Sequence, residues 1–257
     1  MKERRLAMDR STVKAQAKAI VLARRKPILI ASALFLALTL LLSYLSMRLQ
    51  LPTSDKLSML SERITDLMLQ GDYEAAYTLA GSFEPSFLES LVSALLSYLL
   101  AIVAFGYLLV LYRAAHGQEP SPGMLLDGFS LWLKVLLVEL ISRLVVILGL
   151  WAFIIPGILV FYSYRMAPYL LASHPDYGVV DCLRESRQRM RGHRIELFLL
   201  DLSFLGWLLL ALVPILGLAA AVWALPYWNC SCILMYDAIF SEHPERFQPG
   251  EGPNGFF

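Results

Sequence analysis

Ionisable residues interrupt long apolar stretches of the sequence, and four of them could carry chemistry inside a membrane. They are Glu139, Arg143, Arg165 and Asp201. An isolated charge inside a bilayer costs on the order of 3 kcal/mol on insertion scales, so each should find a partner. We expect Arg143 and Asp201 to face the interior of a helical bundle and to interact. Glu139 competes for Arg143 from one helical turn away, and Arg165 is the alternative partner of either acid.

Two tyrosines, Tyr169 and Tyr227, extend these charges into a polar layer. Each follows a proline, and a proline leaves the carbonyl four residues earlier without its helical donor. Hydroxyls, carbonyls and opposite charges at one depth could relay a proton or an ion, or bind a solute. They could also hold the helices in register, and we favour this structural interpretation.

A second group of charges lies in the polar segment 174–194. It is a stripe of four arginines, Arg184, Arg187, Arg191 and Arg194. A narrow arc lies beside the stripe on a helical wheel and holds Val179, Leu183, Ser186 and Met190. Such a helix is expected to lie in the membrane interface with its arginines among phosphates, each worth about 1 kcal/mol near an anionic surface. The stripe therefore predicts contact with anionic lipid headgroups at the cytoplasmic face.

Motifs of known active sites do not occur in the sequence. It has no G-x-S-x-G, no H-E-x-x-H, no glycine-rich phosphate loop and no CxxC pair. Cys230 and Cys232 form a C-x-C inside an apolar run, and we interpret them as small buried or lipid-facing residues. His193, next to the arginines, is interpreted as an interfacial neighbour and not as a base. We therefore expect a protein that is not an enzyme and that holds neither a metal nor a cofactor.

The overall composition predicts a membrane protein. Hydrophobic residues make up 58% of the 257 residues and charged residues 17%, against about 45–50% and about 25% in globular domains. The net charge of +1 gives no argument for nucleic acid as a partner. Because the charges cluster between long apolar runs, we predict an all-α, polytopic bundle of transmembrane helices with interfacial amphipathic helices.

Six runs are apolar enough to predict transmembrane helices. They cover residues 27–47, 87–112, 131–154, 157–173, 195–213 and 218–240. The fourth run is short, so a re-entrant hairpin is an alternative there. Turns are expected at Pro156-Gly157 and at Pro214–Gly217, and a break is expected at Gly192.

The segments around these runs complete a predicted single transmembrane domain over 27–240. Residues 1–26 are basic and predict a helix on the inner membrane surface, although a simple topogenic charge cluster explains them as well. The loop 48–86 is rich in acidic residues, which suits the outer side, and it should hold two short helices. The tail 241–257 is rich in Pro and Gly and is predicted to be flexible. Basic segments on the inside place both termini in the cytoplasm.

The last two predicted hairpins share a spacing. A proline followed twelve residues later by Pro-Tyr occurs at Pro156 and again at Pro214, an offset of 58 residues. The same offset relates Arg143 to Asp201. The agreement predicts a parallel internal repeat, with chance matching of a few residues as the alternative.

Several longer motifs together resemble a known family. They are MDRSTVKAQAK near the N-terminus, WAFIIPGILVFYSYRMAPYLLA, RMRGHRIELFLLDLSFLGW and the later LPY. In combination they resemble the uncharacterised bacterial integral membrane protein family known as domain of unknown function 975. The resemblance implies a multi-span helical fold in the bacterial cytoplasmic membrane. It supplies no activity, so no functional residue follows from it.

Two classes of function fit these observations. The favoured class is a non-catalytic membrane protein that acts as a scaffold, a regulator or a lipid-interacting protein. The alternative is a transporter or channel for a small solute or ion, using the intramembrane Arg/Asp layer. Membrane lipid is the expected partner, while homo-oligomer formation and protein partners stay open.

Overall fold

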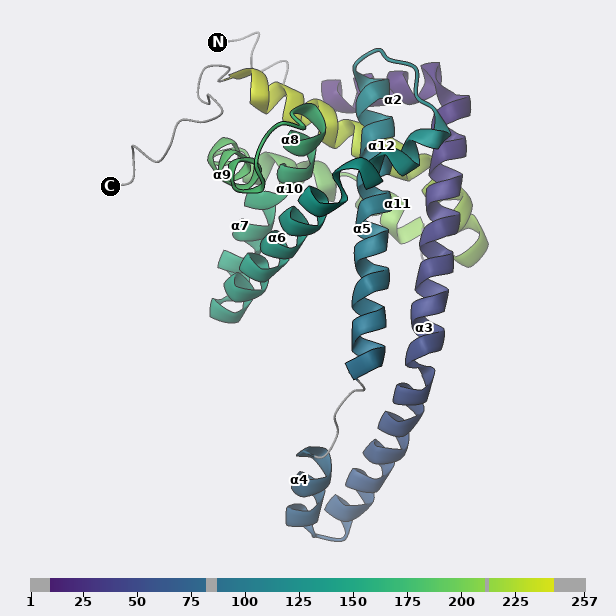
Figure 1. Ribbon diagram of the computed structural model, residues 1–257, viewed down its shortest axis with the longest axis vertical. Coiled ribbons are helices and arrows are strands. Elements are labelled where there is room, and N and C mark those ends of the chain that lie inside the picture. The colour runs from purple at the N-terminus through teal and green to yellow at the C-terminus, as the bar shows by residue number, and fades with distance from the viewer. Residues whose placement is uncertain (1–9, 82–86, 211–212, 243–257) are drawn as a thin grey trace, which may run out of the picture. The chain divides into compact units, whose positions relative to one another are not determined.

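The computed structural model of the chain is all-α (Figure 1) and describes residues 10–81, 87–210 and 213–242. No strand occurs within these ranges. The predicted flexible tail falls almost wholly outside them, as do the first nine residues of the basic N-terminal segment.

Four helical stretches among the described residues are long and apolar enough to cross a membrane. They are Arg25–Leu49, Ser90–Ala115, Ile154–Ser173 and Gly217–Ser241. They correspond to the first, second, fourth and sixth predicted spans. The protein is therefore described as multi-pass, with four candidate spans where the sequence predicted six.

The chain divides into two compact units, of which the smaller is Ala37–Leu100. It contains part of α3 (Arg25–Leu69), α4 (Tyr73–Gly81) and part of α5 (Phe87–Ala115). Since α3 runs without a break to Leu69, the first short helix predicted in the loop is a continuation of the first span. The second predicted helix is α4, and the Asp72 carboxylate accepts a hydrogen bond from the Ala75 N–H at 3.1 Å, as an N-cap does.

The larger unit comprises Met1–Leu36 and Ala101–Phe257. Its first helix, α2 (Arg10–Ala23), packs along α12 (Pro214–Glu242). The apolar stripe of α2 is buried, with Val13, Ala17 and Val21 at most 1% exposed. The apolar face of this helix is therefore covered by protein.

A helical hairpin is formed by α6 (Trp132–Ala152) and α7 (Ile154–Tyr164). The chain reverses at Phe153, which is extended at φ −166° and ψ 153°. The turn predicted at Pro156-Gly157 is thus displaced: Pro156 falls in the first turn of α7, where a missing N–H is harmless. Gly157 serves the packing, because a Cβ there would lie 2.4 Å from the Leu150 side chain.

A second close approach joins α5 to the 3₁₀ helix η1 (Pro122–Leu131). A Cβ at Gly106 would lie 2.0 Å from the Leu125 carbonyl oxygen, and one at Gly128 would lie 2.4 Å from the Ile102 carbonyl oxygen. The two backbones touch here because neither glycine has a side chain.

The polar segment predicted to lie in the interface forms α9 (Val179–Arg189), which packs on α6, α7 and α8 (Ala167–Ser173). Leu183 and Met190, from the narrow arc beside the arginine stripe, are buried within the protein. Gly192 has φ 95°, and the predicted break after this helix is confirmed.

The run predicted as the fifth span is not one helix. It forms α10 (Arg194–Leu202) and α11 (Leu205–Leu210), and α12 begins at Pro214, where a turn had been predicted. The Ser203 hydroxyl donates to the Leu200 carbonyl at 2.6 Å, and the Phe204 N–H donates to the Asp201 carbonyl at 2.9 Å. Such local bonds compete with the regular helical ladder and end α10.

The helix boundaries do not follow the predicted 58-residue repeat. In the first hairpin α6 is continuous and the returning arm breaks after Tyr164. In the second the first arm breaks at Ser203, and α12 is continuous through Pro226.

Candidate functional site

Arg165 lies at the junction between α7 and α8. It is the C-cap residue of α7, with φ −64° and ψ −24°, and Pro168 occupies the first turn of α8. A positive charge is favoured at a helix C-terminus because the last carbonyl groups carry partial negative charge. The junction therefore places a cation inside the bundle at a position that partly stabilises it.

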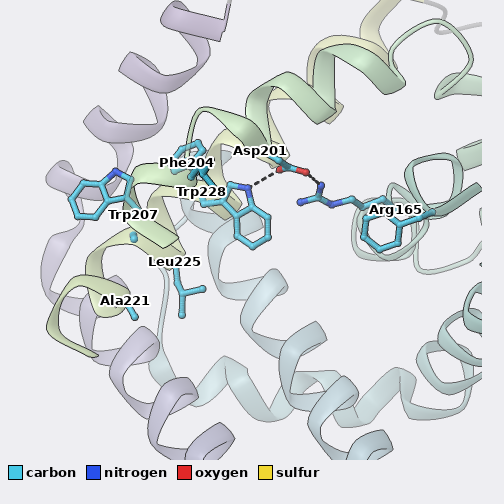
Figure 2. A pocket seen from close by; sticks show the side chains of 10 residues that line it. Arg165, Asp201, Phe204, Trp207, Ala221, Leu225 and Trp228 are labelled. Carbon is cyan, nitrogen blue, oxygen red and sulfur yellow. Dashed lines mark hydrogen bonds and ion pairs between the residues drawn. The ribbon is translucent and has the colours of Figure 1, made fainter. Parts of the chain in front are cut away.

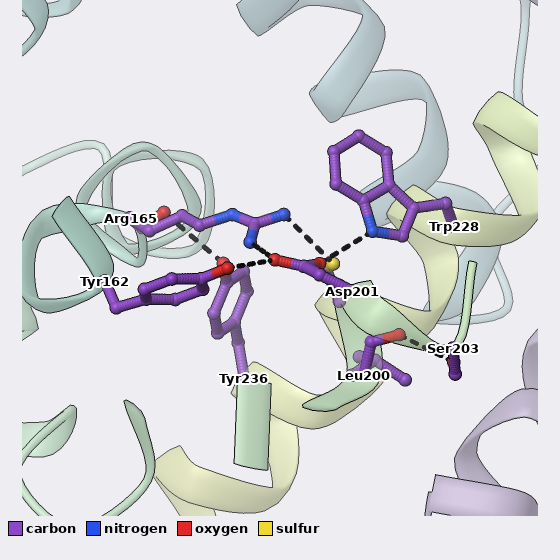
Figure 3. A network of polar contacts seen from close by, with 8 residues as sticks. Tyr162, Arg165, Leu200, Asp201, Ser203, Trp228 and Tyr236 are labelled. Carbon is purple, nitrogen blue, oxygen red and sulfur yellow. Dashed lines mark hydrogen bonds and ion pairs between the residues drawn. The ribbon is translucent and has the colours of Figure 1, made fainter. Parts of the chain in front are cut away.

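Asp201 lies in the last turn of α10. A carboxylate is disfavoured at this end of a helix for the same electrostatic reason, so it needs donors from other elements. It receives them from α7, from the α7–α8 junction and from α12, as Figure 3 shows.

Three side chains donate to the Asp201 carboxylate. The Tyr162 hydroxyl donates to Oδ2 over 2.9 Å and the Trp228 indole N–H donates to Oδ1 over 2.8 Å. Arg165 forms an ion pair with Oδ2 through Nη1. The Arg165 and Asp201 side chains are only 15% and 19% exposed, so the pair is largely desolvated and its geometry decides its stability.

Aromatic rings surround the Arg165 guanidinium. The ring centroids of Trp228, Tyr162 and Phe161 lie 5.1, 5.7 and 6.0 Å from Cζ. These distances lie within the range of cation–π attraction. The Tyr236 hydroxyl also donates to the Arg165 carbonyl at 3.5 Å, which ties α12 to the α7–α8 junction.

The predicted pairing of Arg143 with Asp201 is replaced by the alternative pairing. Asp201 pairs with Arg165, whereas Arg143 pairs with Glu139 on its own helix at 2.7 Å. The Arg143 side chain is 51% exposed and that of Glu139 is 32% exposed. The local pair forms because residues four apart on a helix are neighbours.

A cavity of about 400 Å³ opens beside the Arg165–Asp201 pair. It is lined by Phe161, Arg165, Asp201, Phe204, Leu205, Trp207, Ala221, Ala224, Leu225 and Trp228. In Figure 2 the charged pair lies at one end of the labelled side chains, and Trp207 and Ala221 lie at the other. Eight apolar or aromatic side chains with one polar end match the usual make-up of a small-molecule pocket.

The two tyrosines of the predicted polar layer, Tyr169 and Tyr227, make contacts in different places. Tyr227 packs against the ring of Phe204, with centroids 4.9 Å apart, and so adjoins the cavity lining. Tyr169 donates instead to Asp237 Oδ1, and His116 Nε2 lies 3.3 Å from the same oxygen. His116 Nδ1 faces the carbonyl of Tyr112 at 2.9 Å. The His116 ring therefore lies between two hydrogen-bond acceptors, the Tyr112 carbonyl and the Asp237 carboxylate.

The predicted arginine stripe is partly exposed. Arg187 and Arg191 are exposed, while Arg184 and Arg194 are half-buried. None of the four joins an ion pair with a described residue.

A buried ion pair on the same helix was not predicted. Arg189 and Glu185, four residues apart, are 4% and 1% exposed. Arg189 Nη1 also donates to the Phe240 carbonyl at 2.8 Å, whereas Glu185 Oε2 has no hydrogen-bond partner among the described residues. Burial and the nearby Arg189 charge lower the pKa of His174, whose ring stacks on Tyr177.

Two of the site residues that were not predicted, Asp237 and Tyr162, could have been identified from the sequence. Asp237 is a carboxylate in an apolar run, so the rule that identified Asp201 applies to it equally. Tyr162 lies three residues before Arg165 and thus on the same helix face. Trp228 had no signal, because only the packing of α12 against α10 brings it to Asp201. No group of three or more potential metal ligands gathers within the described part of the chain.

Comparison with known proteins identifies the family. Neither a curated protein nor a solved structure matches the chain. A family model described as "Protein of unknown function (DUF975)" matches residues 8–243. The match covers every helix of the larger unit and the cavity, and it confirms the resemblance of the sequence motifs. The chain belongs to the DUF975 family of proteins of unknown function.

Proposed function

We propose that this protein is a non-catalytic membrane protein that binds an amphiphilic molecule from the membrane in the cavity beside Arg165 and Asp201. The cavity itself carries the proposal. Its walls are apolar and aromatic, and its polar groups converge at one end. An amphiphile with an apolar body and a polar head has the matching distribution of chemistry.

The proposed topology has six crossings in the bacterial cytoplasmic membrane, with both termini inside. The hairpin partner of α7 is α6, which has 21 residues and is about 31 Å long, enough to cross the hydrocarbon core. The Glu139–Arg143 pair on α6 reduces the cost of its charges. The consecutive helices α10 and α11 provide the remaining crossing, and the basic residues of α2 favour the inner side.

Anionic lipid headgroups are the proposed partners of the arginine stripe. Arg187 and Arg191 are exposed, and cations on the cytoplasmic side are attracted to anionic lipids. We propose this contact as peripheral and separate from the cavity.

Filling the cavity tests the proposed function. Ala224 lines the cavity, and Ala224→Phe should occupy it; Ala219, on the same helix, is exposed outside it, so Ala219→Phe is a matched control. Nanodiscs with a brominated single-chain lipid should quench tryptophan fluorescence saturably in the wild type and in Ala219→Phe. The saturable part should disappear in Ala224→Phe. Equal quenching in all three proteins would exclude the cavity as the binding site.

The second candidate function is transport of a small solute or ion. It is favoured by two ionisable clusters that each include one residue of a candidate span, Arg165 with Asp201 and Asp237 with His116. Proteoliposomes of the wild type should then show a flux that Asp201→Asn reduces. A folded wild-type protein with no flux for protons, alkali cations or common metabolites would remove this candidate.

A further inference from the structure

We infer that the cavity selects a single-chain amphiphile with an anionic head that accepts hydrogen bonds, such as a carboxylate or a phosphate monoester. The inference rests on the proposed function and names the ligand class of the same site. It follows from the donors and acceptors around the charged pair, from the local charge and from the size of the cavity.

Arg165 has donors left over after its protein contacts. A guanidinium group carries five N–H donors. Nη1 binds Asp201, and Nη2 has the Cys232 sulfur at 3.7 Å, which is a weak acceptor. No other hydrogen bond joins the Arg165 side chain to a described residue. Since aromatic rings flank the guanidinium, an acceptor in the guanidinium plane is the contact that remains to be made.

Asp201, in contrast, is already supplied with donors. Its Oδ2 accepts from Tyr162 and Arg165, and its Oδ1 accepts from Trp228. Three of the roughly four acceptor sites of the carboxylate are therefore used, and a ligand that donates hydrogen bonds, such as an amine, finds only one. Because Arg165 keeps more unused N–H donors than Asp201 keeps acceptor sites, the polar end of the cavity favours a ligand head that accepts hydrogen bonds.

The local charge favours an anion. The Lys14 ammonium lies 4.7 Å from the ring centroid of Phe204, which lines the cavity, and 3.2 Å from the Ser203 hydroxyl. With Lys14 and Arg165 against Asp201, two cations oppose one carboxylate next to the cavity. This excess favours a negative head, with Lys14 contributing less than Arg165 because its contacts are solvent-exposed.

The size of the cavity favours one chain. Its volume of about 400 Å³ is near the lower limit of ligand pockets, which run from about 300 to 1,000 Å³. Its apolar end is bounded by Trp207, Ala221 and Leu225. A fatty acid or a single-chain phosphate fits this space, whereas only one chain of a two-chain phospholipid could enter it.

A panel of probes with one chain and different heads tests this class. Tritiated laurate would be bound to the wild type in phosphatidylcholine nanodiscs and displaced by laurate, dodecyl phosphate, dodecyltrimethylammonium or dipalmitoyl phosphatidylglycerol. Laurate or dodecyl phosphate should displace it at a concentration lower by about tenfold or more than the ammonium probe. The more effective of the two anions identifies the head as carboxylate or phosphate.

Variants of the charged pair and of the cavity wall distinguish a wrong ligand class from a wrong binding site. Arg165→Gln with Asp201→Asn removes both charges together, and it should abolish the preference for anions. Arg143→Gln, which alters an ion pair outside the cavity, should retain it. If a tritiated ammonium probe or the two-chain lipid binds better than laurate and Ala224→Phe blocks that binding, the ligand class is wrong and the site stands. If no probe shows binding that Ala224→Phe reduces, both proposals are overturned.

Discussion

At the scale of single residues, the molecule depends on how it compensates charges placed among apolar helices. Asp201 is held by three donors from other elements, and Arg165 by one carboxylate and a ring of aromatic side chains. Neither residue would be stable there alone, because the desolvation of an unpaired charge costs several kcal/mol.

Removing one partner of this pair should therefore be severe. Asp201→Asn leaves the Arg165 charge without its counter-ion and should lower the free energy of unfolding by about 3–5 kcal/mol. Reversible unfolding in mixed detergent micelles measures the change. Arg113→Gln is the control, since the Arg113–Asp127 pair at the proposed cytoplasmic end of α5 is partly exposed and should contribute about 1 kcal/mol or less. Equal effects of the two substitutions would contradict the structure.

The sequence could predict that these charges need partners, but not which partners they take. The cost of a charge in an apolar helix depends on composition alone. The choice of Arg165 over Arg143 depends on the position of the reversal at Phe153 and on the break at Ser203. Neither is visible in the hydrophobic pattern. Trp228 could not be predicted either, because only the packing of α12 against α10 brings it to Asp201.

At the scale of elements, glycines determine how closely two helices approach. Gly106→Ala should force α5 and η1 apart, because the added Cβ would meet backbone, not a movable side chain. Overpacking of this kind costs about 1–3 kcal/mol, measured as a lower unfolding free energy. Gly206→Ala, with nothing within 4 Å of the added Cβ, should be neutral or slightly stabilising. A neutral Gly106→Ala would disprove the close contact.

The cluster between α8 and α9 should make stability depend on pH. Burial and Arg189 lower the pKa of His174 below its ordinary 6.5, against smaller opposing effects of Glu185 and Asp176. Between the lowered value and 6.5 the unfolded chain binds more protons, so stability rises with pH in that window. The stability that this lowered pKa contributes is fully present above pH 6.5, and it is lost as the pH falls from 6.5 through the lowered pKa of His174.

Replacing His174 tests this pH dependence. His174→Phe keeps a ring between Tyr177 and Phe240, whose centroids lie 4.6 and 5.2 Å from that of His174. Unfolding curves across the window should show a shallower rise of stability with pH than the wild type. An unchanged slope would assign the pH dependence to another group.

The hydrophobic pattern predicted helix existence better than helix continuity. The runs at 87–112 and 131–154 correspond to α5 and α6 within a few residues. The fifth run failed because Ser203 and Asp201 end α10 through bonds that a pattern of apolar residues does not record. In the segment 174–194 the arginine stripe predicts an interfacial helix, but the pattern does not reveal that Glu185 and Arg189 form a buried ion pair.

At the scale of the whole molecule, the proposed topology can be checked by labelling. Single cysteines would be introduced at Asp72 and Phe153, proposed to be outside, and at Gln118 and Gln188, proposed to be inside; all four are exposed. The three native cysteines are buried and should give little background. An impermeant maleimide applied to intact cells should label the first two positions only. Labelling at Gln118, or protection at Phe153, would contradict six crossings.

The central claim is that one amphiphile occupies the cavity beside Arg165 and Asp201, and native mass spectrometry tests it most directly. The wild type and Ala219→Phe, released gently from native nanodiscs, should each carry one adduct with the mass of a single-chain anionic amphiphile. Ala224→Phe should release from the same nanodiscs without it. No adduct in the wild type, or the same adduct in all three proteins, would contradict the account.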